Sequence, residues 1–443
     1  MEAMIEPVGP LRGLVVVPGD KSIAQRALLL GSLALGESRV AGVPGSGDVA
    51  SMTECLRRLG VQITPVEEVA GGPRGKTVIV RSAGMRALVE PTDVLDVGNS
   101  GTAMRLLIGV ATGLAGLSVL TGDPSVRRRP MDRVAAPLRG VGASIWARGG
   151  DLAPIAVVGG TPIKGGVHEL PMASAQVKSA LLLAGLCAEG ETTVYEPRPS
   201  RDHTERLLAM QGVGIQCGPG WARVAPCETL SPIDLEVPGD ISSAAFLLGA
   251  AAVVPGSEVT VEGVGLNPRR TGFLDVLRSM GAQLTVEVEG NLAGEPSGRV
   301  SMRYSQLTGA RIGPDMVADL IDELPLLAGV ASHSVGCLEV SGAGELRVKE
   351  SDRIAAIAAG LGRLGVEVET WSDGFRVVGG QPTGGSVDPA GDHRIAMMAA
   401  VVGLAGGGKT RIGGWECTQT SFPGFLEILA GLSGDGQGGW TGA

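Results

Sequence analysis

The sequence has few aromatic residues, few cysteines and no long apolar run. Its 443 residues include 5 Phe, 5 Trp and 2 Tyr, so Ala, Val, Leu and Ile have to supply most of the core. The 6 cysteines form no C-x-x-C pair, which argues against a zinc site and against a disulfide framework. No apolar stretch reaches the roughly eighteen residues that a membrane-spanning helix needs. We therefore expect a cytoplasmic protein without a membrane partner.

An excess of positive charge is also missing. The net charge of −9 speaks against a nucleic-acid partner, which usually requires a basic surface. Small anionic substrates stay possible, because a few Arg and Lys in a cleft can dominate locally. The length predicts two or three domains, and 44% hydrophobic residues exclude disorder. A monomer is our default expectation.

A two-part pattern recurs roughly every 65 to 85 residues along the chain. The first part is a polar or Gly-rich turn followed by an Ala/Leu-rich helix and a β-branched run. The second part is an amphipathic helix that ends in a glycine before a strand. The glycines expected to adopt positive φ are Gly60, Gly142, Gly212, Gly281 and Gly365. Six such units predict a mixed α/β protein in which the first helix of each unit is buried.

Polar and basic side chains gather at the starts of these buried helices. Lys21, Ser22 and Arg26 lie in the first copy, and Asn99 to Thr102 lie in the second. A helix start offers unsatisfied N–H groups and the positive end of the helix dipole, which attract anions. Each signal alone is more typical of a cap or a solvated charge. Their recurrence at equivalent points of a repeat predicts a site for a substrate with several negative charges.

Eight segments resemble one known family in order and spacing. They are PGDKSIAQRALLL, GNSGTAMR, RRRPM, SAQVKSALLLAGL, SRDHTE, ELRVKESDR, GDHRIAM and TSFPGF, spread from Pro18 to Phe425. The chain resembles the 5-enolpyruvylshikimate-3-phosphate synthases among the enolpyruvyl transferases. The resemblance implies a two-domain inverse α/β barrel with three units per domain and a cleft between the domains. The implied domains are residues 1–19 plus 239–443 and residues 20–238, with a disordered tail at 434–443.

The resemblance also implies two small-molecule substrates, shikimate 3-phosphate and phosphoenolpyruvate, and no metal or cofactor. Residues expected to hold shikimate 3-phosphate are Lys21, Ser22, Arg26, Ser174, Ala175, Gln176, Arg201, Asp322 and Lys349. Residues expected to hold phosphoenolpyruvate are Lys21, Asn99, Gly101, Arg129, Gln176, Arg353 and Arg394.

Two carboxylates and one lysine match the family's catalytic residues. Addition of the 5-hydroxyl to phosphoenolpyruvate needs a base and an acid, and elimination then releases phosphate. The resemblance makes Asp322 the base and Glu350 the acid, with Lys21 beside them. The alternative is that both carboxylates only form salt bridges to Arg353 or Lys349.

One position departs from the family pattern, and two other functions compete. Thr420 stands where family members carry a lysine, whose charge Arg201 or Lys178 could replace. The sister transferase that acts on UDP-N-acetylglucosamine usually has a reactive Cys in the loop that here reads GDPSVRRRPMDR, and Asn where this chain has Ser22. A binding protein without catalysis is the second rival.

The family's inhibitor, glyphosate, provides a further expectation. Insensitive relatives carry Ala at the position of Gly101, whose methyl group crowds the inhibitor. Leu106 stands where sensitive members often have a proline, which favours the opposite outcome. We give the direct steric effect more weight and expect inhibition.

Overall fold

The structure is a computed structural model that describes residues 1–66 and 72–434. Two compact units divide the chain. Unit 1 comprises Met1–Pro18, Gly239–Gly290 and the described chain from Pro296 on. Unit 2 comprises Gly19–Pro238 together with the short turn Asn291–Glu295.

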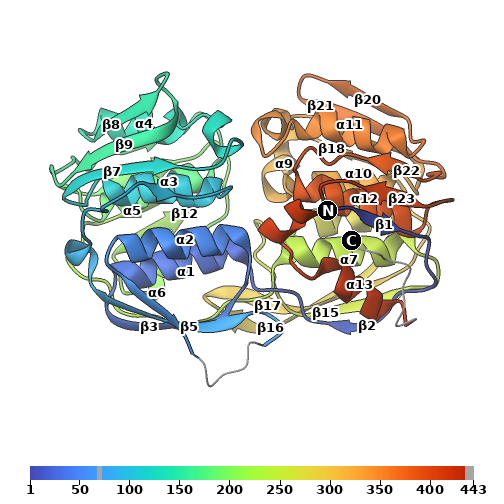
Figure 1. The fold of residues 1–443 in the computed structure, drawn as a ribbon, viewed down its shortest axis with the longest axis horizontal. Coiled ribbons are helices and arrows are strands. Elements are labelled where there is room, and N and C mark those ends of the chain that lie inside the picture. The colour runs from blue at the N-terminus through green and yellow to red at the C-terminus, as the bar shows by residue number, and fades with distance from the viewer. Residues whose placement is uncertain (67–71, 435–443) are drawn as a thin grey trace. The chain divides into compact units, whose positions relative to one another are not determined.

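Unit 2 alternates helices and short strands (Figure 1). Its helices are α1 (Lys21–Leu33), α2 (Gly47–Arg58), α3 (Gly101–Ala111), α4 (Asp132–Gly140), α5 (Ala175–Gly185), α6 (His203–Met210) and the 3₁₀ turns η1 (Met85–Ala87) and η2 (Val126–Arg128). Its strands are β3 (Leu35–Val43), β4 (Gln62–Pro65), β5 (Lys76–Ala83), β6 (Leu95–Asp96), β7 (Gly116–Thr121), β8 (Ser144–Arg148), β9 (Leu152–Gly159), β10 (Val167–Glu169), β11 (Thr192–Tyr195), β12 (Ile215–Gly218), β13 (Trp221–Val224) and β14 (Asp234–Glu236).

Unit 1 repeats this alternation (Figure 1). Its helices are α7 (Ile241–Val253), α8 (Gly272–Ser279), α9 (Pro314–Leu320), α10 (Leu324–Ala331), α11 (Arg353–Arg363), α12 (His393–Leu404), α13 (Phe425–Leu432) and the 3₁₀ turns η3 (Gly344–Val348) and η4 (Trp415–Thr420). Its strands are β1 (Ala3–Ile5), β2 (Arg12–Val15), β15 (Glu258–Gly265), β16 (Gln283–Leu292), β17 (Glu295–Arg303), β18 (Thr308–Ile312), β19 (Val335–Val340), β20 (Val368–Trp371), β21 (Gly374–Val378), β22 (Gly385–Val387) and β23 (Thr410–Ile412).

The described strands form six small sheets, three in each unit. The orders in unit 2 are β14-β3-β5-β4, β6-β7-β9-β8 and β10-β11-β13-β12. In each, the first pair is parallel and the next two pairs are antiparallel. Unit 1 has β2-β15-β17-β16 and β18-β19-β21-β20, plus a three-stranded sheet β1-β23-β22.

Apolar helices fill the interior of each unit, as the sequence pattern predicts. Every residue of α7, α10 and α12 is buried, and α1, α3 and α5 bury nearly all of theirs. Figure 1 shows α1, α3 and α5 within unit 2, and α7, α10 and α12 within unit 1. Burying such helices on all sides requires Ala, Leu and Gly, which let neighbouring backbones approach closely. The mixed α/β class is confirmed.

Several local predictions also hold. The five glycines expected after amphipathic helices all have positive φ, from 77° to 104°. The tail expected to be disordered lies outside the described residues, apart from Gly434.

His333, in the turn after α10, predicts how stability varies with pH. Its Nε2 atom lies 3.2 Å from the backbone oxygen of Val402 in α12. Burial lowers the pKa of His333 to about 4, although the contact with Val402 opposes the shift. Between about pH 6.5 and 4 the unfolded chain therefore binds the proton more readily, so this stability is present above 6.5 and lost toward 4.

Replacing His333 by Gln, which can still donate to Val402, should remove this acid dependence. We expect the variant to lose less stability than the wild type between pH 7.5 and 5, by about 1 to 2 kcal/mol. Urea unfolding at the two pH values measures the difference. Equal losses in the two proteins would contradict the prediction.

Candidate active site

Three buried helices of unit 2 begin at turns that the sequence singles out, and each start is capped by a side chain. Asp20 accepts hydrogen bonds from the backbone N–H groups of Ser22 and Ile23, at 2.8 and 3.0 Å, at the start of α1. Ser100 caps α3 and Ser174 caps α5 through their hydroxyl oxygens. The caps fix the turns that carry the predicted substrate residues.

Side chains also join the three helix starts to one another. Between α1 and α3, the hydroxyl of Ser100 donates to Gln25 Oε1 at 2.7 Å. Between α3 and α5, Arg105 donates to Gln176 Oε1 at 2.5 Å, and Gln176 Nε2 donates to Thr102 Oγ1 at 2.8 Å. The structure therefore brings together turns that lie about 75 residues apart in sequence.

Basic side chains surround these joined starts. Lys21 Nζ lies 2.9 Å from Asp48 Oδ2, and both side chains are largely buried. Arg26 is 4% exposed and donates from Nε to Thr204 Oγ1 at 2.9 Å. Arg129 is 7% exposed and donates to Ser125 Oγ at 3.1 Å. Buried cations beside helix N-termini favour binding of an anion.

Gly101 lies against two of these guanidinium groups. A Cβ atom added there would lie 2.7 Å from Arg129 Nη1 and 3.1 Å from Arg105 Nη1. The neighbouring Asn99 donates from Nδ2 to Asp123 Oδ2 at 2.6 Å. Because glycine has no Cβ atom, two arginine side chains can approach the start of α3 at Gly101. A methyl group at this position would disturb their approach.

The predicted residues of unit 1 form a second cluster around Arg353. This guanidinium is 1% exposed and lies 2.8 Å from Asp392 Oδ2, 2.6 Å from Glu350 Oε2 and 3.5 Å from Asp322 Oδ1. Burial lowers the pKa of Arg353, but Asp392, Glu350 and Asp322 together raise it by a larger amount. The net shift is upward, so the group stays charged.

Two more basic residues approach Asp322 in the same cluster. Lys349 Nζ and Arg394 Nη2 each lie 4.0 Å from its carboxylate. Arg394 Nη1 also donates to the backbone oxygen of Asp322 at 2.6 Å. Asp322 and Glu350 thus make ion pairs of the kind that the alternative, purely structural interpretation requires. Their catalytic roles stay predictions.

Some residues of both clusters were not singled out from sequence. Asp48 pairs with Lys21, and Asp392 is fully buried against Arg353. Glu323, also fully buried, lies 3.6 Å from Arg394 Nη1. Asp392 stands inside the quoted segment GDHRIAM, and Glu323 directly follows the assigned Asp322. Each is an acidic residue at the start of an apolar helix, and this position could have marked both residues in the sequence.

Two residues bear on the lysine that the chain lacks at Thr420. The Thr420 hydroxyl lies 3.4 Å from His393 Nδ1 and donates to Cys417 O, so this position lies beside the start of α12. Lys178 Nζ lies 2.8 Å from both Glu196 and Glu205 inside unit 2. The charge of Lys178 is therefore compensated inside unit 2, which disfavours the replacement role, and both Lys178 and Arg201 stay predictions.

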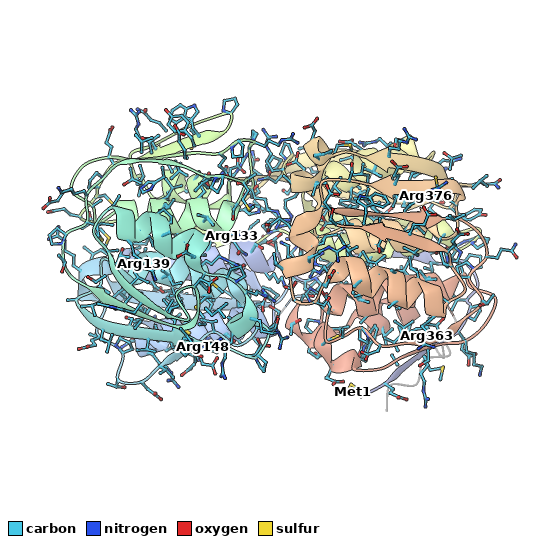
Figure 2. All side chains as sticks on the ribbon, turned by 90° about the horizontal axis from the view of Figure 1, so that it is seen from above. Met1, Arg133, Arg139, Arg148, Arg363 and Arg376 are labelled. Atoms are coloured by element: carbon cyan, nitrogen blue, oxygen red, sulfur yellow. The ribbon has the colours of Figure 1, made fainter. Side chains whose placement is uncertain are left out.

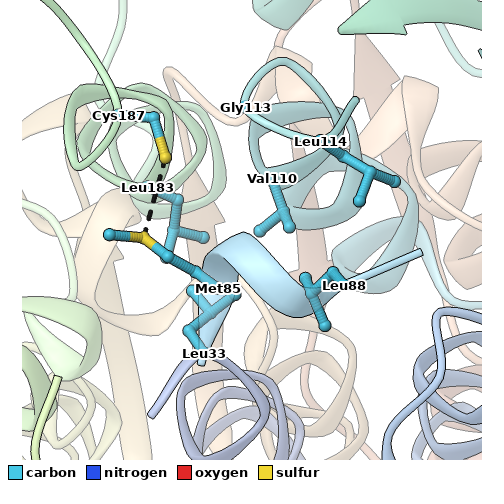
Figure 3. Close-up of a pocket in the computed structure, with 8 residues that line it drawn as sticks. All are labelled: Leu33, Met85, Leu88, Val110, Gly113, Leu114, Leu183 and Cys187. Atoms are coloured by element: carbon cyan, nitrogen blue, oxygen red, sulfur yellow. Dashed lines mark hydrogen bonds between the residues drawn. The ribbon is translucent and has the colours of Figure 1, made fainter. Parts of the chain in front are cut away.

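Other features of the described chain lack this chemistry. Figure 2 labels Arg148 on β8 and Arg363 on α11, which are exposed, unlike Arg353. Figure 3 shows a small pocket in unit 2 whose polar atoms include Cys187 Sγ, 3.6 Å from Met85 Sδ. No charged residue lines it, so it does not suit a phosphate; the lining residues are Leu33, Met85, Leu88, Val110, Gly113, Leu114, Leu183 and Cys187.

Fold and side chains together define a mixed α/β protein with basic side chains at the joined helix starts of unit 2 and a network of Arg, Lys and carboxylate side chains in unit 1. The family model described as EPSP synthase (3-phosphoshikimate 1-carboxyvinyltransferase) matches residues 5–429. The chain belongs to this family.

Individual relatives agree with the family model. A 3-phosphoshikimate 1-carboxyvinyltransferase of Thermus thermophilus is 50% identical over 430 residues, covering 97% of this chain and 98% of that protein. One from an Anaeromyxobacter species is 49% identical over 426 residues, 96% of each chain. A solved EPSP synthase structure from Acinetobacter baumannii has a TM-score of 0.84 at 41% identity, covering 98% of both chains. Among the described residues, no helix has the length and apolar character needed to cross a membrane.

The Arg353 cluster predicts a large and local stability effect. Asp392→Ala removes the fully buried carboxylate closest to Arg353 Nε and should lower the free energy of unfolding by about 3 to 5 kcal/mol. Asp352→Ala is the matched control, since Asp352 caps helix α11 from a more exposed position, as Asp392 caps α12. It should cost about 1 kcal/mol. Urea unfolding compares them, and equal losses would contradict a special role for buried pairing.

Proposed function

We propose that the chain transfers the enolpyruvyl group of phosphoenolpyruvate to the 5-hydroxyl of shikimate 3-phosphate. The products are 5-enolpyruvylshikimate 3-phosphate and phosphate, which places the reaction in the biosynthesis of aromatic amino acids. The observation that supports it most directly is the joining of three capped helix starts, with buried Arg and Lys beside them. Membership of the EPSP synthase family supplies the reaction.

The acceptor substrate is assigned to both units. Helix starts offer N–H groups and hydroxyls to a phosphate, and the guanidinium of Arg26 adds charge. We propose that shikimate 3-phosphate binds Lys21, Ser22, Arg26, Ser174, Ala175, Gln176, Arg201, Asp322 and Lys349.

The donor substrate carries a carboxylate and a phosphate and needs several cations. Arg129 lies beside Gly101, and Arg353 and Arg394 both contact Asp322. Guanidinium groups such as these can bind two oxygens of a carboxylate or phosphate at once. We propose that phosphoenolpyruvate binds Lys21, Asn99, Gly101, Arg129, Gln176, Arg353 and Arg394.

The proposed chemistry is addition followed by elimination. Asp322 accepts the proton of the 5-hydroxyl as that oxygen bonds to C2 of phosphoenolpyruvate, and Glu350 donates a proton to C3. The tetrahedral ketal phosphate then loses a proton from C3 while the bond from C2 to the phosphate oxygen breaks. Lys21 stabilises the phosphate that leaves.

The acid role of Glu350 places a demand on Arg353. A guanidinium at 2.6 Å favours the charged carboxylate, whereas an acid has to hold a proton. We propose that Arg353 pairs with the carboxylate or phosphate of phosphoenolpyruvate when this substrate binds. Its ion pair with Glu350 is then weakened, which allows Glu350 to be protonated.

The finer architecture is also a proposal. We infer the inverse α/β barrel of the enolpyruvyl transferases for each unit. Sheets of equal strand order and nearly fully buried helices in both units support it.

A phosphate-release assay tests the function directly. With phosphoenolpyruvate, we expect turnover with shikimate 3-phosphate and none with UDP-N-acetylglucosamine. Release with the nucleotide sugar alone would favour the sister transferase. Binding of shikimate 3-phosphate without phosphate release would favour a binding protein.

The two carboxylates are tested by variants that keep their shape. Asp322→Asn and Glu350→Gln should each lower kcat at least about a hundredfold, because general acid–base groups contribute about 10² to 10⁴. Steady-state kinetics provides the measurement, and binding of shikimate 3-phosphate should change less. A variant that turns over like the wild type would remove its residue from the mechanism.

Gly101→Ala tests how the inhibitor glyphosate binds. The added methyl group would lie 2.7 Å from Arg129 Nη1, so the guanidinium has to shift and the space beside it shrinks. We expect glyphosate to compete with phosphoenolpyruvate in the wild type, and the variant to weaken inhibition much more than substrate use. Inhibition constants within about twofold of each other would show that Gly101 does not control the inhibitor.

A further inference from the structure

Lys178 is a buried cation of unit 2 that the proposed reaction does not use. It lies on α5, one turn after the cap Ser174, and is 4% exposed. Its Nζ atom lies 2.8 Å from Glu196 Oε2 and 2.8 Å from Glu205 Oε1. Lysine is almost never buried so completely without a counter-charge. This ammonium joins α5 to the end of β11 and to the first turn of α6.

The carboxylate of Glu196 binds much more than the lysine. Its Oε1 atom accepts from the backbone N–H of Ser174 at 3.0 Å and from the hydroxyl of Ser200 at 2.5 Å. Its Oε2 atom accepts from the backbone N–H of Ser200 at 3.2 Å. One side chain thus fixes two loops, the first at the start of α5 and the second just before Arg201.

Glu205 contacts the same ammonium but holds no loop. Its second oxygen, Oε2, has no hydrogen-bond partner among the described residues. Burial raises the pKa of the Glu205 carboxyl, and Lys178 offsets this only in part. For Lys178 itself, burial lowers the pKa, but Glu205 and Glu196 together raise it by a larger amount. The net shift is upward, so the lysine stays charged. Glu205 serves as a second counter-charge.

We propose that Glu196, anchored by Lys178, is a positioning residue that sets the spacing of the Ser174 and Arg201 segments for shikimate 3-phosphate. The inference rests on the proposed function, which assigns both segments to that substrate. Glu196 acts through the N–H groups of Ser174 and Ser200 and touches no reacting atom. An error in this spacing weakens substrate binding and leaves the proton-transfer groups of unit 1 intact.

Two Glu→Gln variants form a matched pair, because both glutamates contact the same ammonium at the same distance. Glu196→Gln replaces one acceptor oxygen by an amide that repels its donors. We expect the KM for shikimate 3-phosphate to rise at least about tenfold, with kcat within about threefold of the wild type. For Glu205→Gln we expect KM and kcat within about twofold.

Glu196→Asp provides a second test with the charge retained. Its shorter side chain can pair with Lys178 but cannot also reach both loops, so KM should rise at least about fivefold. Circular dichroism identifies the folded variants. An unchanged KM in Glu196→Asp, or equal KM values in the two Glu→Gln variants, would overturn the inference. A wild type that fails to use shikimate 3-phosphate would instead defeat the proposed function.

Discussion

A helix buried on all sides has to satisfy its first backbone N–H groups without water, and this constraint organises the structure. Asp20, Ser100 and Ser174 meet it in unit 2, and Asp240 and Asp392 meet it in unit 1. The positive ends of the helix dipoles lie at the same turns. A repeated solution to a packing problem therefore creates the places where anions are stabilised.

Buried cations impose the complementary requirement, since each needs a nearby negative charge. Lys21 is paired with Asp48, Lys178 with Glu196 and Glu205, and Arg353 with three carboxylates. These pairs have different consequences. Lys178 pairs with carboxylates to which we assign no proton transfer, whereas Arg353 contacts the two carboxylates to which we assign it.

The sequence predicts the local features well, because they depend on residues close together in the chain. The apolar helices, the glycines that follow amphipathic helices and the turns around Lys21, Gly101 and Ser174 are of this kind. Partner choice is less predictable. The contacts of Gln25 with Ser100 and of Lys178 with Glu205 depend on how helices pack, which periodicity does not encode. The suggestion that Lys178 replaces a lysine at position 420 stays a prediction, which its contacts with Glu196 and Glu205 oppose.

We expect the starts of α1 and α5, each joined to α3, to bind the phosphorylated acceptor. A crystal structure of the chain with shikimate 3-phosphate tests it most directly. We expect oxygens of shikimate 3-phosphate within about 2.7 to 3.2 Å of donors on Lys21, Ser22 and Ser174. A ligand bound away from these helix starts would contradict it.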